Sequence, residues 1–176
     1  MAQLEQAILT SAPDGLTPSF FKRFIDDLIM IWLHGEESLL RFFAHVNSAH
    51  REIKFTMDYG RRVSYMDATL EIMDDGHISS DLFTKPTDSH QYLLPSSNHP
   101  PHVHRNLPYG LAIRIRQIVS QEDKFHSRLH ELKTFLLARG YGHAHINKQF
   151  KRAKAVPRVH ALQTKSTNRE IGRAHV

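Results

Sequence analysis

The sequence predicts an α+β fold, in which antiparallel strands with one packed helix precede a basic bundle of three helices. Residues 20–84 contain short runs of aromatic and β-branched residues separated by turn-forming residues, a pattern typical of strands. Residues 106–155 instead carry apolar residues at helical spacing. The charge also changes along the chain: residues 1–100 hold 8 Lys and Arg against 14 Asp and Glu, whereas residues 101–176 hold 15 against 4. We therefore expect an acidic module followed by a basic one.

The composition excludes several classes of protein. The chain of 176 residues contains no cysteine, which rules out a disulfide framework and a thiolate metal site. No apolar run approaches the length of a membrane span, and the N-terminus lacks the pattern of a signal peptide. We therefore expect an intracellular protein, nuclear or cytoplasmic, that has no membrane partner.

Two adjacent aspartates, Asp26 and Asp27, lie between two short apolar runs. The runs from Phe20 to Arg23 and from Leu28 to Trp32 are predicted to be strands, and the aspartates suit the tight turn of a hairpin. Burying two neighbouring carboxylates is costly, and a divalent cation removes that cost. Mg²⁺ binds carboxylate oxygens together with substrate phosphates, and two such ions can carry out phosphoryl transfer. A solvated turn is the alternative, and the two residues taken alone favour it.

One helix is expected after this hairpin, at about residues 36–50, in addition to a short helix from Ala2 to Thr10. Ser38 is predicted to cap it, and the neighbouring glutamates favour its positive N-terminal end. A strand is expected next, from Ile53 to Met57. The core-facing stripe of the helix is predicted at Leu39, Phe43 and Val46.

A second hairpin is predicted to end the acidic half. Its turn is Asp74-Asp75-Gly76, which leads into a strand from Ile78 to Phe83. The strand before the turn is predicted to begin at Tyr65 and to alternate apolar and polar side chains, with Met66, Ala68, Leu70 and Ile72 on the apolar side.

Residues 84–108 are predicted to be a loop, because they contain five prolines. His99, His102 and His104 cluster in this loop. Imidazole is a common metal ligand, but the spacing fits neither a zinc finger nor a helical metal motif. Contact with phosphate is therefore the favoured interpretation of these histidines.

Three amphipathic helices are predicted to follow, and the second is expected to end at Gly140. Their apolar stripes are Leu111, Ile115 and Ile118, then Phe125, Leu129, Leu132 and Leu136, then Ile146, Phe150 and Ala153. Basic residues occupy the opposite faces, at Arg114, Arg116, Lys148, Lys151, Arg152 and Lys154. The short glycine-containing turn before the third helix predicts a helix-turn-helix-like arrangement that contacts nucleic acid. A basic face that is merely solvated is the alternative.

The C-terminal residues 157–176 are polar and basic without periodicity, so we expect a disordered tail there. The last residues, from Glu170 to Val176, resemble the translated sequence of a sequencing-library adapter. They are excluded from the fold prediction as an artefact of assembly.

The segment Phe24-Ile25-Asp26-Asp27 resembles the aspartate box of reverse transcriptases, in which tyrosine more often holds the first position. Further motifs follow it in the order of that family: Trp32, Gly35, Asn47, His50, Ile53-Lys54-Phe55-Thr56, Tyr65-Met66-Asp67, Thr84-Lys85-Pro86-Thr87-Asp88, Tyr92-Leu93, Ser97-Asn98-His99-Pro100 and Gly140-Tyr141. The ordered series, over residues 20–155, resembles the reverse transcriptases of Penelope-like and related animal retroelements.

This resemblance implies an RNA-directed DNA polymerase whose partners are an RNA template, a DNA primer and a dNTP. Residues 1–105 would be the C-terminal part of its palm, with a catalytic and a primer-grip-like hairpin, and residues 106–156 its helical thumb. Asp26 would be the main ligand of two Mg²⁺ ions, Asp27 a weaker ligand, and Lys54 a general acid toward pyrophosphate. Lys85 would contact phosphate, and the basic helical residues named above would follow the nucleic-acid backbone.

The first catalytic aspartate of the family would precede residue 1, so the resemblance implies a fragment that is inactive alone. The alternative is a non-catalytic helix-turn-helix module left by a decayed element, which binds nucleic acid without polymerising it.

Overall fold

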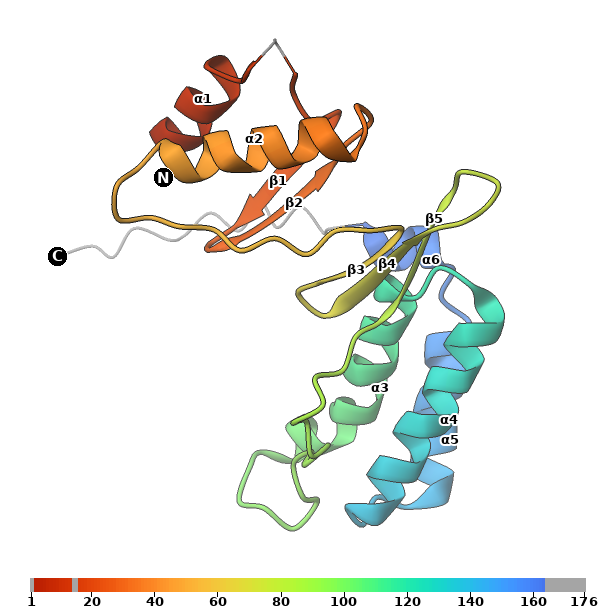
Figure 1. Cartoon of the computed structure of the whole chain (residues 1–176). Coiled ribbons are helices and arrows are strands. Elements are labelled where there is room, and N and C mark those ends of the chain that lie inside the picture. The colour runs from red at the N-terminus through yellow and green to blue at the C-terminus, as the bar shows by residue number, and fades with distance from the viewer. Residues whose placement is uncertain (1, 14–15, 164–176) are drawn as a thin grey trace, which may run out of the picture. The chain divides into compact units, whose positions relative to one another are not determined.

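Within residues 2–13 and 16–163, which the computed structural model describes, the chain forms six helices and five strands (Figure 1). The strands form two small sheets, of order β1-β2 and β3-β4-β5, so the fold belongs to the predicted α+β class. None of these described helices is long and apolar enough to cross a membrane. The elements in chain order are α1 (Ala2–Thr10), β1 (Phe20–Phe24), β2 (Asp27–Ile31), α2 (Glu36–Ser48), β3 (Arg62–Tyr65), β4 (Ala68–Ile72), β5 (Ile78–Leu82), α3 (Pro101–Ile118), α4 (Glu122–Ala138), α5 (His143–Lys154) and α6 (Arg158–Leu162).

The chain divides into two compact units, Met1–Met66 and Asp67–Val176. The sequence predicts a boundary between residues 105 and 106 instead. The β4–β5 hairpin therefore belongs to the helical unit, because polar contacts described below attach β5 to the helices.

The first unit has a small hydrophobic core built on α1 and α2. Ile8, Phe42 and Val46 are buried there, and Trp32 packs against them. The prediction of Phe43 as a core residue is wrong, since Phe43 is half-buried while its neighbour Phe42 is only 1% exposed. A shift of one residue rotates a helix by about 100°, so tertiary packing decides which of two adjacent aromatic side chains enters the core.

The start of α2 also differs from the prediction. Gly35 holds the N-cap position with φ +84°, and no described side chain caps this end of the helix. Ser38 lies inside the first turn, where its hydroxyl donates to the His34 carbonyl at 2.6 Å. Trp32 Nε1 in turn donates to the Ser38 hydroxyl at 3.0 Å. Ser38 therefore joins the chain after β2 to α2 instead of capping the helix.

Residues 53–57 form no strand, contrary to the prediction. The backbone of Phe55 pairs with a side chain: Phe55 N donates to Asn47 Oδ1 at 2.7 Å, and Asn47 Nδ2 donates to the Phe55 carbonyl at 3.1 Å. The asparagine amide thus supplies the donor and the acceptor that a neighbouring strand would otherwise supply.

The β4–β5 hairpin has the predicted turn. Its strands pair antiparallel from Ala68↔Leu82 to Ile72↔Ile78, and Gly76 in the turn has φ +84°. Glycine adopts this left-handed conformation without a steric penalty. The predicted strand from Tyr65 is interrupted, however, because Met66 has φ +56° and the chain turns before Ala68.

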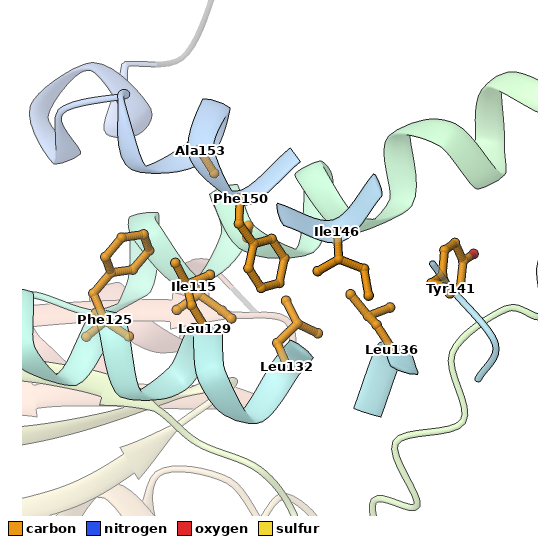
Figure 2. Packing of buried hydrophobic residues seen from close by; sticks show 11 residues of the cluster. Ile115, Phe125, Leu129, Leu132, Leu136, Tyr141, Ile146, Phe150 and Ala153 are labelled. Carbon is orange, nitrogen blue, oxygen red and sulfur yellow. The ribbon is translucent and has the colours of Figure 1, made fainter. Parts of the chain in front are cut away.

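Helices α3, α4 and α5 surround one hydrophobic core (Figure 2). The apolar stripes predicted for α4 and α5 are buried in it, as expected. The stripe of α3 is Ala112, Ile115 and Val119, so the predicted Leu111 and Ile118 are only half-buried. This helix also begins at Pro101 and not near residue 106. Proline suits the first helical position, because the N–H that it lacks would have no partner there and its fixed φ is helical.

Gly140 ends α4, as predicted. It has φ +89°, and its N–H donates to the Leu137 carbonyl at 2.9 Å. The following residue, Tyr141, donates its N–H to the Leu136 carbonyl at 3.1 Å. These two bonds form a Schellman motif, which turns the chain so that α5 begins at His143.

The prediction of a disordered tail from residue 157 is wrong at its start, because Arg158–Leu162 form helix α6. Ala161 is buried, and its carbonyl accepts a hydrogen bond of 2.8 Å from Gln117 Nε2 on α3. The adapter-like residues and the rest of the predicted tail, 164–176, lie outside the described residues.

Candidate nucleic-acid interface

The solvent side of α5 carries a cluster of basic side chains. The helix turns Ile146, Gln149, Phe150 and Ala153 into the bundle, and it contains no acidic residue. The basic residues on its exposed side, which we call the basic face of α5, are Lys148, Lys151, Arg152 and Lys154. Because the buried side chains fix the rotation of the helix, these four residues are held toward solvent together.

Members of the basic face differ in how they are held. The side-chain ammonium groups of Lys148 and Lys151 form no hydrogen bond or ion pair with any residue that the structure describes. Arg152 is fixed on both sides, since its guanidinium lies over the ring of Tyr109 at 4.5 Å and donates to Gln149 Oε1 at 2.6 Å. The two lysines are therefore the residues of this face whose charges meet no partner in the described part of the chain.

The predicted basic residues of α3 are placed differently. Arg116 is buried: its guanidinium lies over the Phe125 ring at 3.9 Å and pairs with Glu122. The hydrogen bond from Arg116 is the main reason that the pKa of Glu122 lies below its usual range. Arg114 is exposed, but its Nε donates to Asp67 at 2.9 Å. Arg116 is thus a structural residue of the helical core and does not belong to an open basic surface.

The turn between α4 and α5 is short and braced from outside. It consists of residues 139–142, and Arg139 Nε donates to the Tyr92 carbonyl at 2.7 Å. Through this bond the loop that precedes α3 is attached to the turn of the helical pair.

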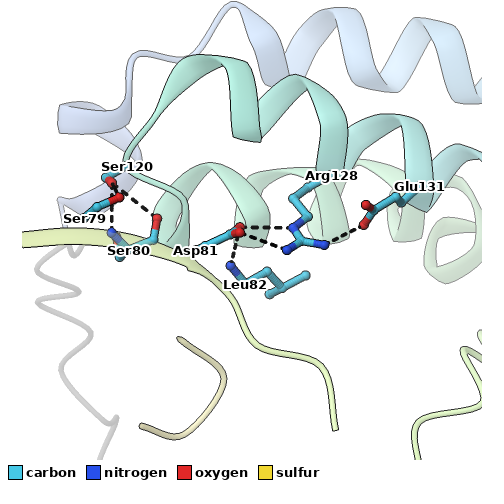
Figure 3. Close-up of polar contacts among 7 residues, drawn as sticks. All are labelled: Ser79, Ser80, Asp81, Leu82, Ser120, Arg128 and Glu131. Carbon is cyan, nitrogen blue, oxygen red and sulfur yellow. Dashed lines mark hydrogen bonds and ion pairs between the residues drawn. The ribbon is translucent and has the colours of Figure 1, made fainter. Parts of the chain in front are cut away.

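Hydrogen bonds attach the β4–β5 hairpin to the turn between α3 and α4 and to α4 itself (Figure 3). Ser80 exchanges backbone bonds with the α3–α4 turn, since Ser120 N donates to the Ser80 carbonyl at 2.9 Å and Ser80 N donates to Ser120 Oγ at 2.9 Å. Arg128 on α4 donates from Nε and Nη2 to the two carboxylate oxygens of Asp81, at 3.0 and 2.8 Å. The Asp81–Arg128 pair and Ser120 hold the hairpin against the helices, and the sequence did not predict these contacts. No local pattern marks a contact between positions 81 and 128.

The electrostatics of this pair follow from its geometry. The hydrogen bond from Arg128 lowers the pKa of the Asp81 carboxyl from its ordinary value, even though burial alone would raise that pKa. The same bond raises the pKa of Arg128. Both groups are therefore charged at neutral pH, and they hold the hairpin on α4 as an ion pair.

The three clustered histidines do not lie in one loop as predicted, because His102 and His104 belong to the first turns of α3 and only His99 precedes the helix. His99 and His104 contact each other edge to face, with ring centroids 5.9 Å apart, and His104 Nε2 donates to the Ser97 carbonyl at 3.0 Å. Among the residues with a described position, no three His, Asp or Glu side chains are grouped so that they could hold a metal ion.

The aspartate pair lies at the tip of the β1–β2 hairpin. Phe24 pairs with Asp27, so Ile25 and Asp26 form the two-residue turn. Ile25 has φ +55°, which is rare for a β-branched residue, and it is exposed. Both carboxylates are exposed as well, so the burial that we considered for them does not occur.

The two predicted lysines outside the bundle are exposed. Lys54 Nζ donates to the carbonyls of Asn47 and His50, at 2.5 and 3.1 Å, and so satisfies acceptors around the C-terminal end of α2. Lys85 begins a turn in which Asp88 N donates to its carbonyl at 2.9 Å. Neither lysine lies on the bundle helices.

Comparison with known families adds one observation about the helical segment. Residues 91–151 match the animal helix-turn-helix domain. This range contains the end of the proline-rich loop, α3, α4 and most of α5, and it includes the short turn between α4 and α5 at which the sequence predicts a helix-turn-helix-like arrangement. No curated protein and no solved structure matches the chain. The match indicates a nucleic-acid-binding segment, and it does not extend to the β1–β2 hairpin.

Proposed function

We propose that the helix-turn-helix domain binds nucleic acid through the basic face of α5, mainly by contacts to backbone phosphates. The observation that carries this proposal is the exposure of Lys148 and Lys151, whose side chains have no partner among the described residues, on α5, the last helix of the matched range. Helices in this position are the ones that enter a groove of the duplex in helix-turn-helix proteins.

The residue types favour backbone contact over base recognition. Lysine is a flexible point charge, which suits phosphate oxygens, whereas base edges are usually read by side chains with paired donors and acceptors. Arg152 has such paired donors, but its guanidinium lies over Tyr109 and bonds to Gln149. We therefore expect binding with little sequence preference, because phosphate contacts carry no sequence information.

Salt dependence tests this proposal. The double variant Lys148→Glu/Lys151→Glu is compared with Lys22→Glu/Arg51→Glu, which changes the net charge equally at exposed positions of the first unit. Each lost phosphate contact should reduce the slope of log K against log salt by about 0.7–0.9, so the first variant should lose roughly 1.4–1.8. The control should keep the slope of the wild type. An unchanged slope in the α5 variant would mean that the basic face is only solvated.

We propose a second candidate function for the first unit, the catalytic hairpin of an RNA-directed DNA polymerase that copies an RNA template from a DNA primer with dNTPs. The turn geometry supports it. A positive φ at the first turn position is normally left to glycine, and strained residues of this kind concentrate at functional sites. Here Ile25 occupies that position, directly before Asp26.

This hairpin offers part of the ligand set that Mg²⁺ needs. Two exposed carboxylates, Asp26 and Asp27, supply the oxygen ligands that Mg²⁺ prefers. A two-ion site requires more ligands than these two, and the described residues contain no group of three or more around them. The two aspartates would therefore hold an ion only in part, and Lys54, whose Nζ bonds to carbonyls near the end of α2, would act on pyrophosphate only after leaving them.

A titration with Mg²⁺ tests the second candidate in the full chain. The double variant Asp26→Asn/Asp27→Asn should weaken Mg²⁺ binding at least tenfold, since it removes both charges while keeping the size of the side chains. Asp58→Asn is the control, because Asp58 is exposed in the same unit. Equal affinity in all three proteins would show that the aspartate pair is only a solvated turn.

A further inference from the structure

A groove opens beside the turn that joins α4 to α5. It has a volume of about 600 Å³, which lies in the range of small-ligand sites. Three segments form it: the loop at residues 95–99, the first turns of α3, and the turn at residues 140–142 with the start of α5. It therefore lies at the N-terminal end of α5, whereas the basic face begins at Lys148, midway along that helix, and continues to its C-terminal end.

Two helices begin at this groove. Pro101 is the first residue of α3 and Gly142 is the N-cap of α5, and both line it. Neither helix has a side-chain cap or an acidic residue in its first turn among the described residues. The N–H groups in the first turn of α5 thus have no side-chain acceptor and can donate to a ligand. The positive ends of two helix dipoles also meet at this groove.

The side chains that line the groove are basic or neutral. His99, Arg105 and His145 contribute to it, and no acidic residue is among the described residues that line it. Arg105 is exposed, and its guanidinium forms no hydrogen bond or ion pair with another described residue. Donors from the backbone and from side chains therefore converge without a matching acceptor, an arrangement suited to an anion.

Two buried polar atoms of the groove residues also have no partner in the described part of the chain. The Tyr141 hydroxyl is one of them, on a residue that is only 5% exposed. Figure 2 shows this hydroxyl pointing away from the other labelled side chains of the hydrophobic cluster. The second atom is Nδ1 of His104, whose Nε2 donates to the Ser97 carbonyl. Because Nε2 of His104 is the donor, Nδ1 of the neutral ring carries a lone pair and offers no hydrogen to an acceptor. The Tyr141 hydroxyl is a donor, and leaving it unpaired costs free energy that a bound acceptor would recover.

We propose that this groove binds the phosphomonoester of a nucleotide, either at the end of a nucleic-acid strand or on a free mononucleotide. A phosphomonoester carries nearly two negative charges and three acceptor oxygens at neutral pH, which matches converging N–H groups and Arg105. The volume of the groove exceeds the need of an isolated phosphate and leaves room for the attached nucleoside beside Pro95 and Tyr141. This inference does not rest on the basic face of α5, which is a separate set of residues.

The test compares binding of an end-phosphorylated oligonucleotide, the same oligonucleotide with hydroxyl ends, and adenosine 5′-monophosphate with adenosine as its control. We expect the end phosphate to increase the affinity of the full chain about tenfold, as a charge-assisted contact of this kind commonly does. Arg105→Glu should remove that increase. Lys148→Glu/Lys151→Glu should weaken both oligonucleotides and leave their ratio unchanged, so failure of the groove and failure of the basic face are distinguishable.

A second variant separates binding from folding. His145→Glu places an acid in the first turn of α5, where a negative charge favours the helix, yet it should repel the phosphate. Loss of the phosphate effect with an unchanged or raised unfolding temperature supports the proposal. Competition by adenosine 5′-monophosphate assigns the groove to free nucleotides, and its absence assigns the groove to strand ends. Equal affinity of the wild type for phosphorylated and unphosphorylated oligonucleotides, together with equal affinity for adenosine 5′-monophosphate and adenosine, would overturn the inference.

Discussion

The substitution Arg128→Met should detach the β4–β5 hairpin from α4 while keeping the apolar stem of the side chain. In the wild type the Asp81 carboxylate accepts two bonds from Arg128 and one from Leu82 N at 2.7 Å. The variant removes two of these three bonds and leaves a carboxylate whose side chain is only 17% exposed.

The expected cost follows from these numbers. A hydrogen bond to a charged group contributes about 1.5–3 kcal/mol when it is buried, and exposed ion pairs contribute about 0–1 kcal/mol. Arg128 is 30% exposed, so solvent screens part of the interaction and the estimate lies between these limits. We expect Arg128→Met to lower the free energy of unfolding by about 2 kcal/mol. Glu131→Gln, which removes only the exposed i,i+3 pair with Arg128 at 2.9 Å, should change it by less than about 0.5 kcal/mol.

The assay is denaturant unfolding of the full chain followed by far-ultraviolet circular dichroism, to which the longer helices of the second unit contribute most. Trp32, the one tryptophan of the sequence, lies in the first unit and reports on that unit separately. A double-mutant cycle with Asp81→Asn should give a coupling energy of about 1–2 kcal/mol. A coupling energy near zero would refute the assignment of this ion pair as the attachment of the hairpin.

The same pair predicts a pH dependence with a definite sign. The pKa of Asp81 is lower in the folded chain than its ordinary value, mainly because Arg128 donates to the carboxylate. Its stabilising contribution is therefore complete above the pKa of the unfolded state and is lost as the pH falls below about 4. The difference in stability between the wild type and Arg128→Met should shrink over that range. A difference that stays constant down to pH 3 would contradict the linkage.

Three further substitutions test the local structure. Gly140→Ala should cost about 1–2 kcal/mol because φ is +89° there, whereas the control Gly110→Ala, inside α3 with open space around it, should stabilise the chain by up to about 1 kcal/mol; denaturant unfolding measures both. Leu132→Ala should cost about 2–5 kcal/mol in the same assay, since Leu132 is 3% exposed in the bundle core, and a cost below about 1 kcal/mol would argue against this packing. Ile25→Gly should raise the unfolding midpoint reported by Trp32 fluorescence, because it relieves the strained turn at φ +55°, and a lowered midpoint would exclude that strain.

Several elements could be derived from the sequence because residues close along the chain determine them. The stripe Phe125, Leu129, Leu132 and Leu136 fixes the buried side of α4 by its spacing alone, and Gly140 fixes the end of that helix. The Asp74-Asp75-Gly76 turn likewise fixes the β4–β5 hairpin, and Asp26 lies in the tight turn expected between two apolar runs. In each case the deciding interactions span only a few residues.

Only the tertiary structure shows the contacts between residues that lie far apart in the sequence. Basic residues of α3 look alike in the sequence, yet Arg116 is buried against Glu122 and Phe125, while Arg114 meets Asp67. The hairpin joins the helical unit because Asp81 meets Arg128, 47 positions away. The groove beside the turn between α4 and α5 likewise forms only where a loop, the start of α3 and the start of α5 come together. Such contacts depend on how the helices pack against one another, which the spacing of residues within a single element does not specify.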